Sequence, residues 1–398
     1  RVFPGRKFDV QIEAAGGLTL EEAIRELRKI NRRPDAIVIY SGHNEFQARY
    51  GWSRNVKYYL DEKPRQRGAL VALTGRLSPL CGLIEDTIDK HRVDEPPPKD
   101  AHRELIDHPS FTPEEYAFLR TDFHRRLEGI VAYCERIGAL PILISPAGNE
   151  GDFPPDRSYL FPAVPLADRE AAARRFQEAR SIELTDPAAA VRLFRALLAQ
   201  HPTFAEAHYR LAKLLEQGGE WPLAREHYLK ARDCDGLPMR CPTDFLAAYP
   251  EVARRHDAIF VDGPAVFARL SPHGIIDDHL IHDGQHPTLR GYIALTQDLL
   301  EKLHTRHAFG WPDSVATPVI DPSECASHFE LDAAKWSFVC HHTAGFHART
   351  SKLRYDPSEH LARVQRLVDA ANQIEAGKSP DEVGITGLGV HPSGLRER

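Results

Sequence analysis

Asp283 and His286 form a D-x-x-H pair whose residue types suit acid–base chemistry, and Pro287 follows the histidine directly. A carboxylate three residues before a histidine can accept the Nδ1 proton, which leaves Nε2 free to take a proton from a serine hydroxyl. The pair lies in a loop before a predicted helix, at the carboxyl side of a predicted strand, where ligands collect in open α/β sheets. The same spacing also occurs in helix caps, so a second feature is needed to assign the chemistry.

Asn44 supplies that second feature. The sequence Gly42-His43-Asn44 follows an apolar run directly, so the chain turns at Gly42 and the Asn44 amide can project over the same edge of the sheet. Its NH₂ group, together with the backbone N–H of Gly17 after the preceding strand, could donate to the oxyanion of a tetrahedral intermediate. An Asx turn or a helix cap is the alternative role for Asn44.

The order of these features resembles the SGNH (GDSL-type) hydrolases: a glycine after one strand, G-x-N after the next, and D-x-x-H-P before the last helix. The resemblance covers about residues 8–150 and 255–305. It implies a three-layer α/β fold with a mostly parallel, flavodoxin-like sheet from which the first strand is missing.

The resemblance also implies roles for the site residues. Gly17, with Gly16 as the other candidate, and Asn44 would form the oxyanion hole, while His286 would be the base and Asp283 would orient it. The reaction would be ester hydrolysis through an acyl-enzyme, on an O-acyl group of a carbohydrate or a small alcohol.

Two features depart from the family pattern. Glu45 stands where the family usually has aspartate. This difference affects how the turn is supported, because the oxyanion role belongs to the asparagine. The block with the nucleophilic serine is absent, since none of the 16 residues before Gly17 is a serine. We therefore expect that serine upstream of this chain. Ser41 and Ser145 lie at predicted strand ends, but the family places its nucleophile on the first strand, so both are poor substitutes.

His43 and Glu45 flank Asn44 and are the candidates for residues that line the substrate pocket. Weaker candidates follow on the same loop: Arg49, Tyr50, Trp52 and Asn55.

No metal site or other cofactor is predicted. Cys340, His341, His342 and His347 lie close together in the sequence, but their spacing fits no zinc pattern well. The six cysteines are widely spread without C-x-x-C spacing, which favours buried thiols. A G-x-x-x-x-G-K phosphate loop is also absent.

Alternating strands and helices must position these residues. A capping box at Thr19 and Glu22 begins a predicted helix that reaches Ile30. The strands are expected at residues 8–14, 36–40, 140–145 and 257–262, and further helices at about 112–138, 289–303 and 356–376. This alternation predicts a mostly parallel sheet between two helical layers.

A helical stretch interrupts this pattern and contains a repeat. Ala190 and Phe194 recur as Ala224 and Tyr228, 34 residues later, and Pro202 closes the first unit. This period is typical of tetratricopeptide (TPR) helix pairs. Two such repeats are marginal alone, so we expect them to lean on the main domain.

The domain organisation follows from these elements. We expect a first hydrolase-like part, a TPR-like insertion, a second hydrolase-like part, and a helical extension with a tail, at residues 1–164, 165–235, 236–308 and 309–398.

Composition limits the partners. Hydrophobic residues at 42% and charged residues at 27% predict a folded, soluble protein. The net charge of -6, with scattered basic residues, argues against nucleic acid, and neither a membrane span nor a secretion signal is found. The compartment is left open.

Three functions follow as expectations. The first is an esterase or deacetylase, and the second is an O-acyltransferase with the same site. The third is a catalytically inactive scaffold that binds a protein partner through the TPR-like insertion.

Overall fold

Three parallel strands form the sheet: β1 (Ala36–Tyr40), β2 (Leu140–Ser145) and β3 (Ile259–Asp262), in the order β1-β2-β3. The structure is a computed structural model that describes residues 8–12, 17–30, 32–46, 113–156, 165–351, 357–380 and 382–383. Across the described ranges the chain is mostly helical, and the sheet is small.

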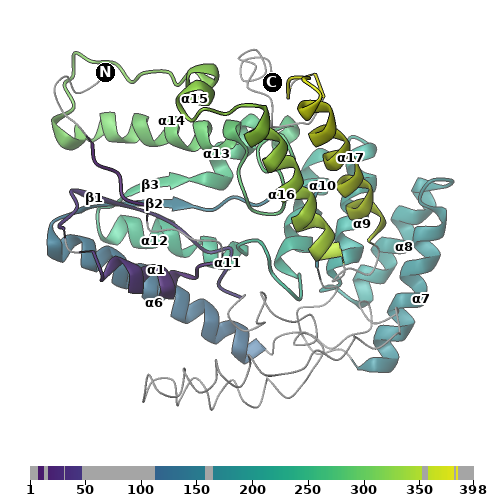
Figure 1. Cartoon of the computed structure of the whole chain (residues 1–398). Coiled ribbons are helices and arrows are strands. Elements are labelled where there is room, and N and C mark those ends of the chain that lie inside the picture. The colour runs from purple at the N-terminus through teal and green to yellow at the C-terminus, as the bar shows by residue number, and fades with distance from the viewer. Residues whose placement is uncertain are drawn as a thin grey trace, which may run out of the picture.

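Helices cover both faces of the sheet (Figure 1). One face packs against α1 (Leu20–Leu27), α6 (Pro113–Ile137), α11 (Thr243–Leu246) and α12 (Ala248–Arg255). The other packs against α13 (Gly263–Leu270) and α14 (Leu289–Thr305). The first side buries Ile39 and Phe123, and the second buries Val261 and Phe267. The predicted sandwich of helix, sheet and helix is therefore present around three strands.

Local sequence signals explain where these elements begin and end. The Thr19 side chain accepts from Glu22 N–H and Glu22 binds back to the Thr19 N–H, so the predicted capping box is confirmed. Gly138 ends α6 with φ +69°, a left-handed conformation that suits glycine.

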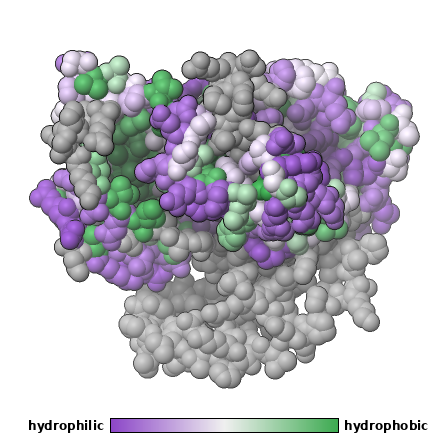
Figure 2. All heavy atoms as spheres, turned by 45° about the horizontal axis from the view of Figure 1, so that its top comes forward, coloured by the Kyte–Doolittle hydropathy of each residue, from purple (hydrophilic) through white to green (hydrophobic). Residues whose placement is uncertain are grey.

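The strand β1 was predicted to be buried, and this holds on one side only. Ile39 is 5% exposed, whereas Val38 is 54% and Tyr40 is 37% exposed. The reason is its position, because β1 is an edge strand among the described strands and α14 does not cover it. Figure 2 shows apolar side chains gathered at the left of the molecule, where Figure 1 places the sheet.

The predicted strand at residues 8–14 is wrong for residues 8–12, which belong to no strand. Val10 and Ile12 are 78% and 79% exposed. An alternating apolar pattern forms a stable strand only when a neighbouring strand takes its hydrogen bonds. Residues 13 and 14 lie outside the described residues.

Four helices form the insertion between β2 and β3 (Figure 1). They are α7 (Leu166–Ile182), α8 (Pro187–Gln200), α9 (Ala205–Gln217) and α10 (Trp221–Asp233). The four residues that predicted the repeat are all fully buried in one apolar cluster: Ala190, Phe194, Ala224 and Tyr228. The small residues allow the helices to approach, and the aromatic rings fill the space between them.

The insertion packs against the rest of the chain. In α9, 8 of the 13 residues are buried, and the Tyr209 hydroxyl donates to the Gly151 carbonyl oxygen at 2.9 Å. Beyond α14 the chain adds α15 (Pro322–His328) and a helical hairpin of α16 (Ala333–Ser351) and α17 (Ser358–Glu375), which lies beside the insertion in Figure 1. Two short 3₁₀ turns complete the elements: η2 (Pro272–Gly274) and η3 (Ala308–Gly310).

None of the helices in these described ranges carries an apolar stretch long enough to cross a bilayer. The five described cysteines are free thiols.

The insertion contains a buried histidine that should make stability depend on pH. His208 Nε2 donates to the Pro202 carbonyl oxygen at 2.9 Å, so its Nδ1 accepts from His227 Nδ1 at 2.8 Å. Burial lowers the pKa of His208 from 6.5 to about 4. The unfolded chain then binds more protons between these two values, so stability is complete above pH 6.5 and is lost as the pH falls toward 4.

Between pH 7 and pH 4 the free energy of unfolding of the native chain falls partly because His208 becomes protonated. We expect this fall to be smaller by about 3 kcal/mol in His208→Gln. Urea unfolding at several pH values measures this slope. His341→Gln is the control, because His341 is 47% exposed. Equal slopes in His208→Gln and the native chain would show that His208 is protonated in the fold.

Candidate active site

The predicted Asp283–His286 pair is formed. His286 Nδ1 donates to Asp283 Oδ2 at 2.7 Å, and Asp283 Oδ1 accepts the backbone N–H groups of Gln285 and His286, both at 2.8 Å. Asp283 is 1% exposed, whereas the His286 side chain is 47% exposed. A buried carboxylate thus fixes the tautomer of an imidazole whose Nε2 has no hydrogen-bond partner within the described part of the chain.

The two pKa values follow from this geometry. Burial alone would raise the pKa of Asp283, but the hydrogen bond from His286 and the nearby His282 and His286 rings outweigh it and lower that pKa. Burial alone would lower the pKa of His286, but the bond to Asp283 and its charge raise it. Asp283 stays ionised, and His286 is a stronger base than a free imidazole.

The turn that carries the pair is tightly built. Ile281 and Pro287 form an antiparallel bridge, and His282 N–H donates to the His286 carbonyl oxygen at 3.1 Å. Gly284 lies against the buried Phe153 ring, where an added Cβ would approach ring carbons to between 2.9 and 3.1 Å. Only glycine fits at this position of the turn without displacing the ring.

Asn44 and Gly17 belong to one local structure. Asn44 Nδ2 donates to the carbonyl oxygen of Leu18 at 3.0 Å, one residue beyond Gly17. Gly17 has φ +83°, which an L-residue rarely adopts. The structure therefore ties the Asn44 side chain to the segment that follows Gly17, and the oxyanion role of both residues stays a prediction. Gly16, the other candidate, lies outside the described residues.

His43, at the end of β1, lies within electrostatic range of the Asp283–His286 pair. Burial, and then the His286 charge, lower the pKa of His43 to about 3, so the two rings lie within electrostatic range of each other. His43 Nδ1 accepts the Cys241 N–H at 3.1 Å. His43 is therefore neutral, and this bond anchors its ring. That His43 lines a substrate pocket stays a prediction.

Glu45 supports the turn. Its Oε1 accepts the Leu20 N–H at 2.9 Å and the Ser41 hydroxyl at 3.2 Å. Burial raises the pKa of Glu45 to about 7, although both hydrogen bonds oppose that shift. The longer side chain at this position thus ties the end of β1 to the start of α1, and a role in binding substrate stays a prediction.

The two serines at strand ends make structural bonds. Ser41 donates to Glu45, and Ser145 Oγ accepts the Gly263 N–H at 3.2 Å, where β2 and β3 end side by side. Neither hydroxyl contacts His286. The loop candidates of lower weight, Arg49, Tyr50, Trp52 and Asn55, lie outside the described residues.

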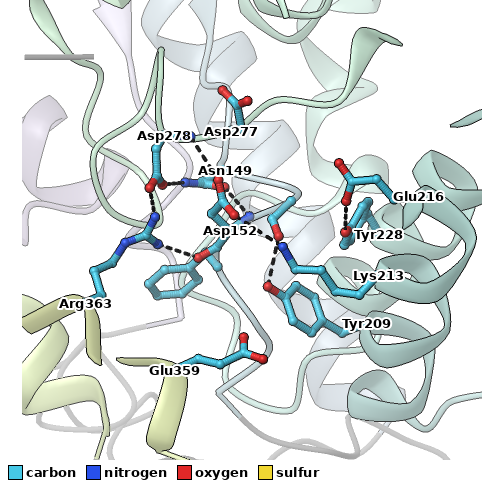
Figure 3. Close-up of polar contacts among 12 residues, drawn as sticks. Asn149, Asp152, Tyr209, Lys213, Glu216, Tyr228, Asp277, Asp278, Glu359 and Arg363 are labelled. Atoms are coloured by element: carbon cyan, nitrogen blue, oxygen red, sulfur yellow. Dashed lines mark hydrogen bonds and ion pairs between the residues drawn. The ribbon is translucent and has the colours of Figure 1, made fainter. Parts of the chain in front are cut away.

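Asn149 is a site residue that sequence reasoning missed. It is fully buried beyond the end of β2, and its side chain donates to Asp278 at 2.9 Å and to the Ile281 carbonyl oxygen at 3.1 Å (Figure 3). Gly148-Asn149 after a buried strand is the same kind of signal that singled out Asn44, so it could have been found.

Residues from α16 also reach the pair, and no pattern in the sequence indicated them. The Phe346 ring stands edge-on to the His286 ring at 6.1 Å, and Thr343 Oγ1 lies 2.8 Å from His282 Nδ1. The described residues contain no group of three or more metal-binding side chains that could hold an ion.

Comparison with known proteins identifies one segment. Residues 182–237 match the tetratricopeptide repeat. No curated protein and no solved structure matches the chain. A tetratricopeptide repeat suggests protein–protein interaction, and in this chain α9 of the repeat is largely enclosed by the protein's own residues.

Proposed function

We propose that Asp283 and His286 form the acid–base centre of an SGNH-type ester hydrolase. One observation carries the proposal: a fully buried carboxylate bonds Nδ1 of an accessible imidazole at 2.7 Å, within electrostatic range of His43, the residue before Asn44. Helix caps need no such accessible imidazole, so the capping role of D-x-x-H explains less of the geometry.

The chemistry proceeds in two steps. A serine hydroxyl attacks the ester carbonyl carbon while His286 Nε2 takes its proton, and the imidazolium then protonates the departing alkoxide. The Asn44 amide and the Gly17 N–H donate to the oxyanion. A water molecule, activated by the same imidazole, then releases the acid and restores the serine.

Our proposed place for the serine strand is the edge of β1 that pairs with no strand among the described residues. A flavodoxin-like sheet has the order 2-1-3-4-5, and the strands β1, β2 and β3 fit its last three positions. The strand with the nucleophile would then pair with β1 and cover Val38 and Tyr40, which are exposed. This placement would put the end of the added strand beside Gly42 and Asn44.

The substrate class rests on the family resemblance: an O-acyl group on a carbohydrate or small alcohol. Transfer to another acceptor uses the same residues and differs only in what attacks the acyl-enzyme. A scaffold role is the second candidate, favoured by the match at residues 182–237. Because α9 is enclosed, a partner of the matched segment would have to use the exposed faces of α8 and α10.

Labelling with a fluorophosphonate tests the proposal in a chain extended by the coding sequence upstream of Arg1. We expect one serine to react, and His286→Ala to slow its labelling at least about 100-fold, because the general base is lost. The matched control is His341→Ala, whose ring has the same exposed fraction of 47%.

Labelling that is unaffected by His286→Ala, or no labelled serine in the extended chain, would rule out the hydrolase and leave the scaffold. The 398-residue chain by itself should give no burst with p-nitrophenyl acetate. A burst that disappears in His286→Ala would instead place the nucleophile within this chain.

A further inference from the structure

Two aspartates, Asp152 and Asp278, lie where the loop after β2 faces the loop that leads to Asp283 (Figure 3). Asp278 N–H donates to Asp152 Oδ2 at 3.4 Å, and Asp277 precedes Asp278 directly (Figure 3). The two carboxylates carry like charges, which repel each other and favour separation of the two loops unless cations neutralise them. In the described part of the chain, Arg363 from α17 pairs with Asp278 and Lys213 from α9 pairs with Asp152.

We infer that Arg363 is a positioning residue for the proposed active site: it clamps the two loops together and so holds the turn that carries Asp283 and His286. This inference rests on the proposed function. It assigns a role to the C-terminal helical hairpin that the family resemblance does not include.

Arg363 bonds to both loops at once. Its guanidinium pairs with Asp278 Oδ2, and its Nη1 donates to the Asp152 carbonyl oxygen at 2.6 Å. Arg363 is only 8% exposed, so water screens these bonds weakly. The guanidinium is therefore a bridge between loops that are distant in the sequence.

Asn149 connects Asp278 to the turn that carries Asp283 and His286. Its side chain binds Asp278 and the Ile281 carbonyl oxygen, and its backbone N–H donates to the Gly284 carbonyl oxygen at 3.1 Å. These two carbonyls lie on either side of Asp283. A shift of Asp278 would thus move the carboxylate that holds the His286 ring.

The insertion anchors α17 about one turn before Arg363. Arg210 on α9 pairs with Glu359 on α17 and with the buried Glu183 that follows α7. Lys213, also on α9, lies 3.3 Å from Asp152. The insertion and the hairpin together thus fix the position from which Arg363 reaches the loops.

The titration of His286 reports on this clamp, because the Asp283 bond raises its pKa. Other described groups that interact electrostatically with Asp283 or His286 are His43, His282, Tyr40 and Tyr292. We expect Arg363→Gln to lower the pKa of His286 by about 0.5 or more, toward the value of a free imidazole. NMR of ¹³C-labelled histidine measures it in the 398-residue chain, with His286→Ala to assign the signal.

Removing the negative charge of Asp278 should reverse the effect of Arg363→Gln on the His286 pKa. If repulsion separates the loops, adding Asp278→Asn to Arg363→Gln should restore most of the pKa, because asparagine still accepts the Asn149 bond. Arg363→Lys should keep the pKa near the native value. Arg366→Gln is the control, since Arg366 is exposed on the same helix.

In the extended chain, Arg363→Gln should lower kcat by about tenfold and leave KM unchanged. An unchanged His286 titration in a folded Arg363→Gln chain would overturn the clamp. Equal effects of the single and double variants would also overturn it. These titrations need no turnover, so they fail or succeed independently of the hydrolase proposal, which the labelling experiment tests.

Discussion

Asp283→Asn should lower the pKa of His286 below that of the native chain and nearly abolish acyl transfer in the extended chain. Asp283 is the partner that raises the His286 pKa, and its Oδ2 is the acceptor for Nδ1–H. An asparagine amide can present N–H to Nδ1 and turn the imidazole to the wrong tautomer. The comparable change in serine protease triads costs about 10,000-fold in kcat.

Two measurements check this expectation, histidine NMR and single-turnover acylation. The amide oxygen of asparagine can still accept the N–H groups of Gln285 and His286, so the turn itself should survive. The control is Asp313→Asn, because Asp313 is 87% exposed. A native rate of acylation in Asp283→Asn would refute the role of the pair in catalysis.

Gly263→Ala should be the most destabilising single change among the glycines that the structure describes. Gly263 begins α13 directly after β3, and a Cβ there would lie 2.1 Å from the Ser145 backbone oxygen. The ends of β2 and β3 would have to separate, and the Ser145–Gly263 bond would lengthen. We expect a loss of about 3 kcal/mol or more in the free energy of unfolding, from overpacking.

Gly129→Ala is the matched control and should have the opposite sign. Gly129 lies within α6, and a Cβ there meets no atom within 4 Å. Alanine in an exposed helix position stabilises by about 0.5 to 1 kcal/mol relative to glycine. Urea unfolding of both variants measures the difference. If Gly263→Ala were as stable as Gly129→Ala, the close approach of the strand ends would be wrong.

The scaffold alternative differs from the hydrolase in what the insertion does. A binding scaffold would present α9 to a partner, yet α9 contacts the Gly151 carbonyl and Asp152 of the same chain. In the proposed hydrolase, the same contacts of α9 help to hold the loop after β2 in place. The tetratricopeptide match by itself fits both.

The sequence by itself determined the features that depend on neighbouring residues. The capping box at Thr19, the strand at residues 36–40 and the buried faces of the repeat arise from local hydrogen bonding and side-chain periodicity. The D-x-x-H pair is also local, because its 2.7 Å bond joins residues three positions apart. Such patterns are readable because each depends on the spacing of residues along the chain and not on which distant segments meet in the fold.

Only the tertiary structure decided which groups surround the pair. Arg363 lies 85 residues beyond Asp278, and Glu45 lies 25 residues beyond the Leu20 N–H that it binds. No spacing rule links such positions, since their contact depends on how complete helices and loops pack. The failed strand at residues 8–12 has the same cause: its apolar alternation is visible, but a strand needs a partner that only the folded sheet can supply.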